Sequence, residues 1–438
     1  MTAMTTWPRL PQPGGGPTVA MRSDDSSELS RAIDGVRPLF QPVVRLDNLS
    51  IVGYEALARG PHGSRLFKPA ALVAAARDAG RIAELDATMA RRSIQALTRV
   101  DWHPSQTLFG NANPEAMTSL PDPATMKILD RAALAGMRIV IEITEKPLLA
   151  NLRALIRANA MLRSRGWGIA MDDVGVEEGS LTLLPILRPD VVKLDMSILH
   201  RPFGAHAAWI SAATRTYCDR TGALMVCEGV ETEAHELRAR ALGADLVQGF
   251  RYGVPAPLPA VTGPAHPPVR LPDLGVTEDQ PLADRLRLVP EAVLSGTQIA
   301  DVATELVATL AGYGTDAVVM ITAPGIDKVP TAYLDAMAAA VPASALVALI
   351  APGCGPHPAP GVRGVDASMQ DDLGSPWSIS IIGPTMAVSI LAESPGADPR
   401  DPLRHRIVHD RMTVAQILRV ALGQSVDHPP TAEIIAFT

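Results

Sequence analysis

Short apolar runs alternate with amphipathic stretches of helical length from about residue 26 to residue 258. Eight runs have the length and composition of strands, and they span 40–44, 50–54, 107–110, 138–141, 168–171, 190–194, 223–227 and 244–250. Segments with helical periodicity lie between them at 69–80, 86–97, 153–166 and 234–243. Eight strands with intervening helices predict an α/β fold, a closed TIM-like barrel of β/α units, with a doubly wound open sheet as the alternative.

A proline-dense stretch separates this unit from a second, smaller α/β unit. Residues 259–282 predict a linker, because prolines are frequent there and hydrophobic periodicity is weak. The second unit covers residues 283–424, with helices predicted at 297–311, 330–340 and 412–422 and strands at 317–322, 345–352, 378–384, 387–393 and 405–408. Residues 1–25, rich in Pro, Gly and Thr, are expected to be disordered, and residues 425–438 to form a loose tail.

Composition and charge narrow the class of protein. The 438 residues carry a formal net charge of −7, without the basic runs that bulk nucleic-acid binding requires. Three cysteines form neither a disulfide framework nor a metal-ligand spacing, so a reducing cytoplasm is the expected location. No apolar run approaches the ~18 residues that a membrane span requires. A small phosphorylated ligand stays compatible with this charge.

Polar side chains end or follow the apolar runs of the first unit. In chain order they are Glu55, Asn111, Glu142, Asp172 with Asp173, Lys193, Glu228 and Gln248. Because the carboxyl ends of the strands in a β/α barrel open on one face, these side chains are expected to meet there. A single acidic residue after a strand is more typical of a helix N-cap, but such residues on seven consecutive runs favour a shared site.

Five carboxylates in one ring require cations, because like charges at close range raise pKa values and burial adds to the cost. Oxygen ligands without His or Cys favour Mg²⁺ or Mn²⁺ over Zn²⁺. The adjacent pair Asp172-Asp173 suits two ions with one bridging carboxylate, an arrangement that clamps the reacting oxygens of a phosphodiester. Lys193 would lie in the same ring and steady negative charge on the phosphorus centre.

These residues fall in motifs that resemble those of EAL domains, the phosphodiesterases that linearise the bacterial second messenger cyclic di-GMP. Tyr54–Arg59 reads YEALAR, which resembles the family signature. The other motifs follow in the family's order: FQP at 40–42, Asn111, ExTE at 142–145, DD at 172–173, KxD at 193–195, EGVET at 228–232 and QGF at 248–250. The resemblance covers about residues 30–257.

The resemblance implies a modified β/α barrel whose first strand is antiparallel to the others, and metal-dependent hydrolysis of cyclic di-GMP to linear pGpG. It implies that one metal ion binds Glu55, Asn111, Glu142 and Asp172, and that a second lies among Asp172, Asp173 and Glu228. Lys193 would contact the attacking water, and Glu228 would assist in removing its proton. The residues implied to hold guanine, phosphate or the edges of the site are Gln41, Arg59, Asp195, Glu231 and Gln248, while Glu145 would brace the loop after the Asp pair.

The loop after the Asp pair departs from the family pattern DDFGTGYSS. Positions 174–179 read VGVEEG, which places Glu177 and Glu178 near an anionic substrate. In the family this loop couples the dimer interface and the substrate to the second metal, and a homodimer through this domain is expected. These two glutamates weaken substrate binding if they face the diester and have no effect if they point to solvent. We therefore expect a competent phosphodiesterase, which is slow in the first case. The alternative is a receptor that binds cyclic di-GMP without turnover, although intact ligand positions favour the enzyme.

The second unit holds no comparable cluster of polar residues. The stretches 377–394 and 406–422 resemble the DICT sensory domain, which implies an α/β input module with an unknown ligand or protein partner. The alternative is a dimerisation or docking domain that binds no small molecule.

Overall fold

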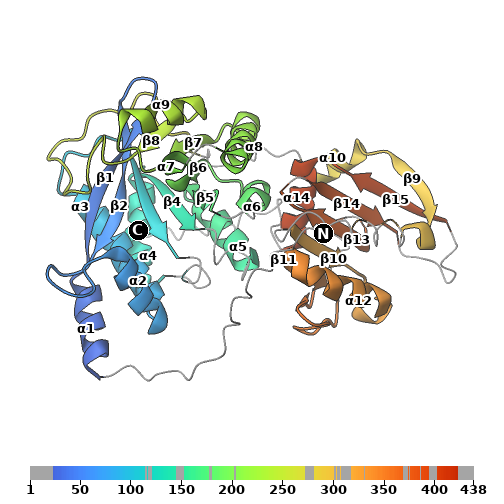
Figure 1. The fold of residues 1–438 in the computed structure, drawn as a ribbon. Coiled ribbons are helices and arrows are strands. Elements are labelled where there is room, and N and C mark those ends of the chain that lie inside the picture. The colour runs from blue at the N-terminus through green and yellow to red at the C-terminus, as the bar shows by residue number, and fades with distance from the viewer. Residues whose placement is uncertain are drawn as a thin grey trace, which may run out of the picture.

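A computed structural model describes residues 23–422 of the chain, with internal gaps. The residues outside the description within this range are 114–115, 117–120, 145–151, 177–179, 202–203, 272–280, 300–301, 303–305, 307–316, 330, 368–372, 374, 385 and 394–401. Most of the predicted helix 297–311 and nearly all of the expected disordered segment and tail therefore lie outside the described residues. The described part forms two units that lie side by side (Figure 1).

The first unit is a closed barrel whose eight strands follow one another in chain order. They are β1 (Arg37–Arg45), β2 (Ile51–Arg59), β3 (Thr107–Ala112), β4 (Arg138–Thr144), β5 (Gly168–Val174), β6 (Val191–Leu194), β7 (Leu224–Cys227) and β8 (Leu246–Gln248). Strand β1 pairs antiparallel with both β2 and β8, and the remaining neighbours are parallel. The predicted barrel is confirmed, and the open-sheet alternative is wrong.

Helices surround this barrel at or near the predicted positions. They are α1 (Ser23–Asp34), α2 (Pro69–Asp78), α3 (Ile82–Leu97), α4 (Pro123–Leu134), α5 (Leu152–Arg163), α6 (Ser180–Leu187), α7 (Ser197–His200), α8 (Ala205–Thr221) and α9 (Glu233–Ala241). Helix α1 begins three residues inside the segment expected to be disordered. Its residues Leu29 and Ile33 pack in one buried cluster with Leu72 and Leu85 of the next two helices. This packing stabilises the helix, although its polar first turn gives no hydrophobic pattern from which a helix could be predicted.

One apolar side chain from each strand fills the inside of the barrel, toward the amino ends of the parallel strands. These are Val43, Val52, Phe109, Val140, Ala170, Val191, Val226 and Leu246, and Ala265 and Val269 complete the same buried cluster. Residues 260–271 therefore close the barrel, which corrects the expected linker at 259–282 over this part. The carbonyl of Gly263 accepts a hydrogen bond from Gln106 at 2.7 Å, so the proline-rich backbone is anchored despite its weak periodicity.

The second unit is a mixed seven-stranded sheet in the order β12-β11-β10-β13-β14-β15-β9. Its strands are β9 (Glu291–Ser295), β10 (Ala317–Thr322), β11 (Ser344–Ile350), β12 (Arg363–Val365), β13 (Trp377–Ile382), β14 (Ala387–Ala392) and β15 (Pro402–Val408). The five predicted strands are present. The pattern did not reveal β9 and β12, which lie at the two sheet edges and are short and mostly exposed or half-buried.

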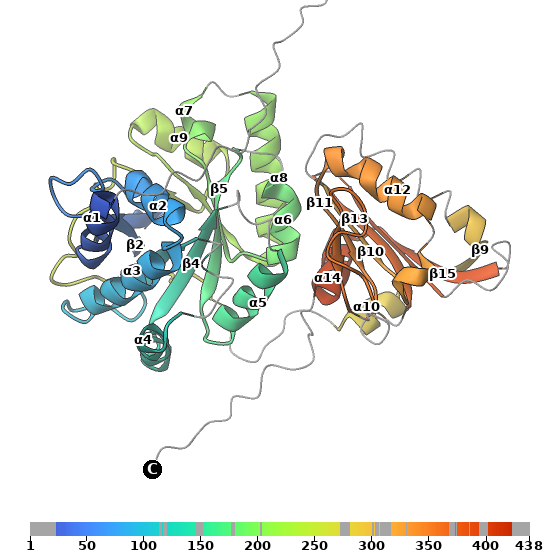
Figure 2. The same cartoon turned by 90° about the horizontal axis from the view of Figure 1, so that it is seen from below.

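Helices cover both faces of this sheet (Figure 2). They are α10 (Leu282–Arg287), α12 (Thr331–Ala340) and α14 (Arg411–Ala421), with short 3-10 turns at Ile326–Lys328 and Val341–Ala343. One face packs against α12 through Met337 and Ala340, and the other packs against α14 through Val414 and Ile417. Among the described residues, no helix is both long and apolar enough to cross a membrane.

Candidate functional site

The buried cluster that Val43 to Leu246 of the eight strands form with Ala265 and Val269 is called the apolar plug below. The candidate site is the layer of side chains next to this plug, toward the carboxyl ends of the parallel strands. Six polar side chains each lie two positions after the apolar residue that the same strand contributes to the plug. Because side chains alternate along a strand, the polar residue and the plug residue both point into the barrel. The residues in question are Asn111, Glu142, Asp172, Lys193, Glu228 and Gln248. Glu55 joins this layer from the middle of β2, where it pairs with Gln41 of β1. The strand continues to Arg59, so Glu55 lies inside the strand and does not follow it.

Lys193 lies at the centre of this layer and is 1% exposed. Its Nζ is 2.7 Å from Glu228 Oε1, 2.9 Å from Glu142 Oε2, 3.2 Å from Asp172 Oδ1 and 3.5 Å from Glu55 Oε2. One ammonium group therefore neutralises part of the charge of four carboxylates that come from four different segments. The sequence predicted that these residues meet, and the structure brings them together.

Amide side chains hold Glu55 in place. Asn111 Nδ2 donates to Glu55 Oε1 at 2.8 Å, and Gln248 Nε2 donates to Glu55 Oε2 at 2.6 Å. Gln248 Nε2 also lies 3.3 Å from Oε1 of Gln41, whose own Nε2 donates to the carbonyl of Gly253 at 3.0 Å. Both oxygens of Glu55 are thus satisfied by fixed donors, which orients this carboxylate toward Lys193.

Burial and charge shift the pKa values of the ring in opposite directions. Burial and the neighbouring Glu55 hold the pKa of Glu142 well above its usual range, against the attraction of Lys193. Burial likewise raises the pKa of Glu228 to about 8, although Lys193 lowers it. For Glu55 burial raises the pKa, but Lys193 together with the hydrogen bonds from Asn111 and Gln248 outweighs it, so its pKa is lowered. Burial opposes the charge of Lys193, yet the surrounding carboxylates hold its pKa well above normal.

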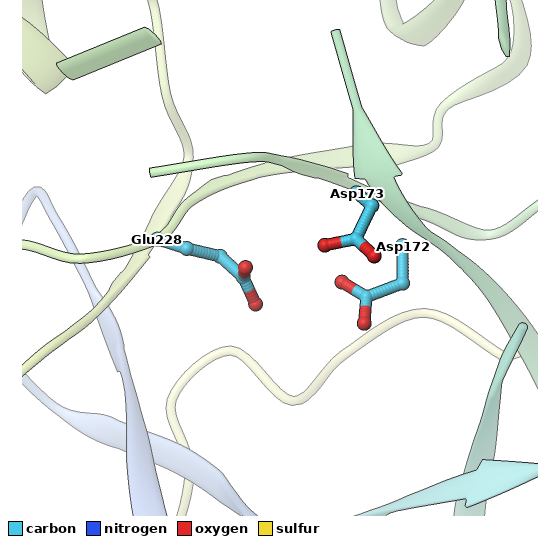
Figure 3. A group of neighbouring side chains, drawn as sticks. All are labelled: Asp172, Asp173 and Glu228. Atoms are coloured by element: carbon cyan, nitrogen blue, oxygen red, sulfur yellow. The ribbon is translucent and has the colours of Figure 1, made fainter. Parts of the chain in front are cut away.

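Three carboxylates at the upper side of the ring form a candidate metal centre. Asp172, Asp173 and Glu228 each offer an oxygen, and these oxygens lie within 4.8 Å of one another (Figure 3). Oε1 of Glu142 is buried without a hydrogen-bond partner, which leaves a deep oxygen available as a ligand. With all groups ionised, five carboxylates and one ammonium leave four formal negative charges, the charge that two divalent ions neutralise. The donor set therefore fits two hard cations.

The backbone at the Asp pair adopts a conformation that few side chains tolerate. Asp173 has φ of 59°, in the left-handed region, and Gly175 follows with φ of 104°. The N–H of Gly175 donates to Ser180 Oγ at 3.5 Å, and His206 Nε2 lies 3.0 Å from the carbonyl of Gly175. Sequence reasoning missed His206, because it lies on α8, far along the chain from the Asp pair, and belongs to no motif.

The remaining predicted residues lie around this ring with different contacts. Arg59 is half-buried, and burial lowers the pKa of its guanidinium while Glu55 raises it. Asp195 Oδ1 accepts the N–H of Ser197, the first residue of the short helix α7, at 2.9 Å. Glu231 is exposed, in the segment after Glu228. Glu145 and residues 177–179 lie outside the described residues.

Comparison with known proteins places this barrel in a family. The EAL domain model matches residues 26–255, just over half of the chain. A protein from Sinorhizobium fredii named y4lL is 31% identical over 222 residues, covering 50% of this chain and 26% of the relative. The cyclic di-GMP phosphodiesterase NbdA of Pseudomonas aeruginosa is 29% identical over 242 residues, covering 53% of this chain and 31% of the relative. This chain therefore spans less than a third of the length of these two relatives.

Two solved structures are also similar to about half of this chain. The structure of BlrP1 from Klebsiella pneumoniae, titled as a complex with manganese and cyclic di-GMP, has a TM-score of 0.44 and 26% identity, covering 51% of this chain and 56% of that one. The FimX EAL domain from Pseudomonas aeruginosa, titled as bound to cyclic di-GMP, has a TM-score of 0.46 and 24% identity, covering 54% of this chain and 98% of that one.

Proposed function

The chain belongs to the EAL domain family, and we propose that it hydrolyses one phosphodiester bond of cyclic di-GMP to give linear pGpG. The observation that carries the proposal is the buried ring of carboxylates around Lys193, with Asp172, Asp173 and Glu228 close enough to share metal ions. The name of the relative NbdA, a cyclic di-GMP phosphodiesterase, supports the same substrate. When bound, two Mg²⁺ or Mn²⁺ ions would supply the Lewis-acid charge that stabilises the reacting oxygens of the diester.

The ligand assignment follows the order of the family motifs along the barrel strands. We assign Glu55, Asn111, Glu142 and Asp172 to a first metal ion, and Asp172, Asp173 and Glu228 to a second. Asn111 contributes a neutral oxygen, and its Nδ2 keeps Glu55 oriented. Oxygen-only donors suit Mg²⁺ and Mn²⁺ alike, so the donor chemistry does not separate these two ions.

Glu228 and Lys193 are the proposed catalytic residues. Glu228 contacts Lys193 at the edge of the candidate metal centre, and its ionised carboxylate would accept the proton of the attacking water. The Nζ of Lys193 lies 2.7 Å from Glu228 and stays positively charged, which orients the base and stabilises negative charge that develops in the transition state.

The binding residues and the setting are further parts of the proposal. We propose that cyclic di-GMP contacts Gln41, Arg59, Asp195, Glu231 and Gln248, and that Glu145 braces the loop above the metals. Arg59 suits a phosphate because a guanidinium can donate two hydrogen bonds at once. We further propose a cytoplasmic enzyme, a homodimer through the barrel, and a C-terminal input module of the DICT type that senses an unknown ligand or partner.

Hydrolysis of cyclic di-GMP by the purified full-length chain, with Mg²⁺ and separately with Mn²⁺, tests the proposal. We expect metal-dependent pGpG by chromatography, and a loss of at least about 100-fold in Glu55→Gln, which keeps the shape of the side chain but removes a charged ligand. Glu84→Gln, at an exposed ion pair with Arg81, is the matched control and should keep full activity. Equal activity in Glu55→Gln would contradict the ligand assignment.

A cyclic di-GMP receptor is the second candidate function, and the loop at 174–179 favours it. Val174 is fully buried and Val176 is exposed, where the family pattern has Phe and Thr. Binding of cyclic di-GMP without any pGpG would support the receptor. Restoring the family sequence at 174–179 would then be the change expected to bring turnover.

A further inference from the structure

Helix α6 is an unusual element for the outside of a barrel, because all eight of its residues are buried. Its sequence, SLTLLPIL, carries no charge, whereas a surface helix normally exposes a polar face. The cover comes from the second unit: helix α14 packs on α6 in both views (Figures 1 and 2). Residues of α6 such as Leu184 share one buried cluster with Ile417 and Leu418 of α14.

Two prolines leave two carbonyl groups of α6 without their helical donors. Proline has no N–H, so Pro185 cannot donate to the carbonyl of Leu181, four residues earlier. The carbonyl of Pro185 lacks a helical donor because α6 ends at Leu187, and Pro189, which follows the helix, has no N–H to offer. A buried carbonyl without a partner costs free energy comparable to a lost hydrogen bond, so each of the two requires a donor from elsewhere.

Two arginines of α14 supply these donors. Arg411 Nη2 donates to the carbonyl of Leu181 at 3.3 Å, and Arg419 Nη1 donates to the carbonyl of Pro185 at 2.6 Å. Both acceptors are thus the carbonyls that the prolines leave unsatisfied. Two carbonyls next to prolines of the barrel thus meet two arginines of the second unit. The contact between α6 and α14 therefore includes directed hydrogen bonds in addition to apolar packing.

Arg411 also ties α6 to the sheet of the second unit. Its guanidinium donates to the carbonyls of Gly383 at 2.6 Å and Met386 at 3.3 Å, in the turn between β13 and β14. Asp410 caps α14 by accepting the N–H of Thr413 at 2.9 Å, which places Arg411 at the first helical position. The arginine is therefore held from its own domain while it contacts the barrel.

Helix α6 begins where the loop after the Asp pair ends. Its first residue, Ser180, accepts the N–H of Gly175, two positions after Asp173. Asp173 is held at φ of 59°, a conformation that persists in a non-glycine residue only when its surroundings impose it. A displacement of α6 would therefore act on the backbone of Gly175, two positions after Asp173, which carries a proposed ligand of the second metal.

We propose that the C-terminal domain braces the metal centre of the barrel through α14 and α6, with Arg411 and Arg419 as positioning residues for the Asp172-Asp173 pair. The inference rests on the proposed function only in taking this pair as metal ligands. It assigns the C-terminal domain a role that needs no small ligand: the docked domain holds α6 and, through Ser180, the backbone of Gly175 that follows the Asp pair.

The test uses the full-length chain with Arg411→Met and Arg419→Met combined, and Arg404→Met as the matched control. Methionine keeps much of the apolar stem and removes the donors, while Arg404 is largely exposed on β15 and pairs with Glu291. Hydrogen exchange reports on residues 180–188, and titration of Mn²⁺, followed by electron paramagnetic resonance of the free ion, reports on the site. We expect exchange about tenfold faster or more in this segment, and Mn²⁺ affinity about tenfold weaker, in the double variant alone.

A third variant separates bracing from simple loss of folding. Arg411→Lys with Arg419→Lys keeps a charged donor at each position, so we expect folding and Mn²⁺ affinity between those of wild type and the methionine pair. Unchanged Mn²⁺ affinity in the methionine pair, or in the lysine pair if the methionine pair unfolds, would overturn the brace. A wild-type chain that binds Mn²⁺ but never yields pGpG would overturn the proposed function and leave the brace intact.

Discussion

Replacing Lys193 with methionine removes the only cation that contacts four carboxylates among the described residues of the ring. Its Nζ lies between 2.7 and 3.5 Å from the oxygens of Glu228, Glu142, Asp172 and Glu55. Methionine has nearly the same length and fills the same buried volume, so the substitution tests charge more than packing. The metal-free chain then holds four buried carboxylates with no ammonium among them.

The expected loss of stability follows from this burial. Removing one partner of a buried ion pair costs about 3–5 kcal/mol. Additional partners do not multiply the loss, because Glu142 and Glu228 already have raised pKa values and take up protons when Lys193 is gone. At roughly 2–4 °C per kcal/mol for a domain of this size, we expect the barrel to unfold about 10 °C lower.

Thermal unfolding followed by circular dichroism, in EDTA and separately in MnCl₂, measures this loss. Lys328→Met is the control, because Lys328 forms an ion pair with Asp327 at 3.2 Å while 66% exposed, and such pairs contribute about 0–1 kcal/mol. Mn²⁺ replaces the missing positive charge, so we expect the deficit of Lys193→Met to narrow by half or more. The electrostatic account would be refuted if both variants lowered the melting temperature by the same small amount, or if MnCl₂ left the loss in Lys193→Met unchanged.

Three further predictions concern the framework of the two domains. In Gly53→Ala the new Cβ would lie 2.1 Å from the carbonyl oxygen of Thr107, so urea unfolding should show a loss of about 1–3 kcal/mol; unchanged stability would contradict the close approach of β2 and β3. Asp410→Ala removes the cap of α14 and should lower the free energy of unfolding by about 1 kcal/mol in the same measurement. An unchanged free energy of unfolding would mean that water replaces the cap. Hydrogen bonds, first from Arg251, lower the pKa of Glu236 to about 2, so its ionised form stabilises the fold above its unfolded pKa and this stability is lost as pH falls toward 2. The melting temperature of Glu236→Gln should therefore lie below that of wild type at pH 7, and the difference should shrink below pH 4.5; a constant difference would exclude this linkage.

Strand periodicity allowed the barrel and most of the ring to be predicted. The carboxyl ends of barrel strands open on one face, so Glu142 and Asp172, which follow apolar runs, could be placed together there from the sequence. Glu55 was predicted to follow a strand because the run 50–54 stops at a polar residue. The strand instead continues to Arg59, since an inward-facing carboxylate with fixed partners does not interrupt a ladder of backbone hydrogen bonds.

Contacts made through backbone atoms were beyond sequence reasoning. The segment 260–271 looked like a linker because its prolines suppress periodicity, yet Ala265 and Val269 are fully buried in the barrel. The pairing of α6 with α14 was equally hidden, because a carbonyl acceptor leaves no residue type to recognise. Pro185 and Pro189 reveal which carbonyls lack donors, but only the fold reveals that Arg411 and Arg419 reach them.

The depth of each carboxylate divides the ring into two levels. Glu142 and Glu55 are almost fully buried and lie at the lower level beside Lys193, whereas Asp173 is half-buried at the rim with Glu228 and Asp172. Lys193 contacts both levels, because its Nζ lies 2.7 Å from Glu228 Oε1 at the rim and 2.9 Å from Glu142 Oε2 below it. A cation at either level therefore competes with the ammonium group for carboxylate oxygens. Two of the three rim carboxylates, Asp172 and Asp173, lie at the end of β5, just before the segment that Ser180 of α6 holds through the N–H of Gly175. The C-terminal brace would therefore act on the ion at the rim and not on the ion at the lower level.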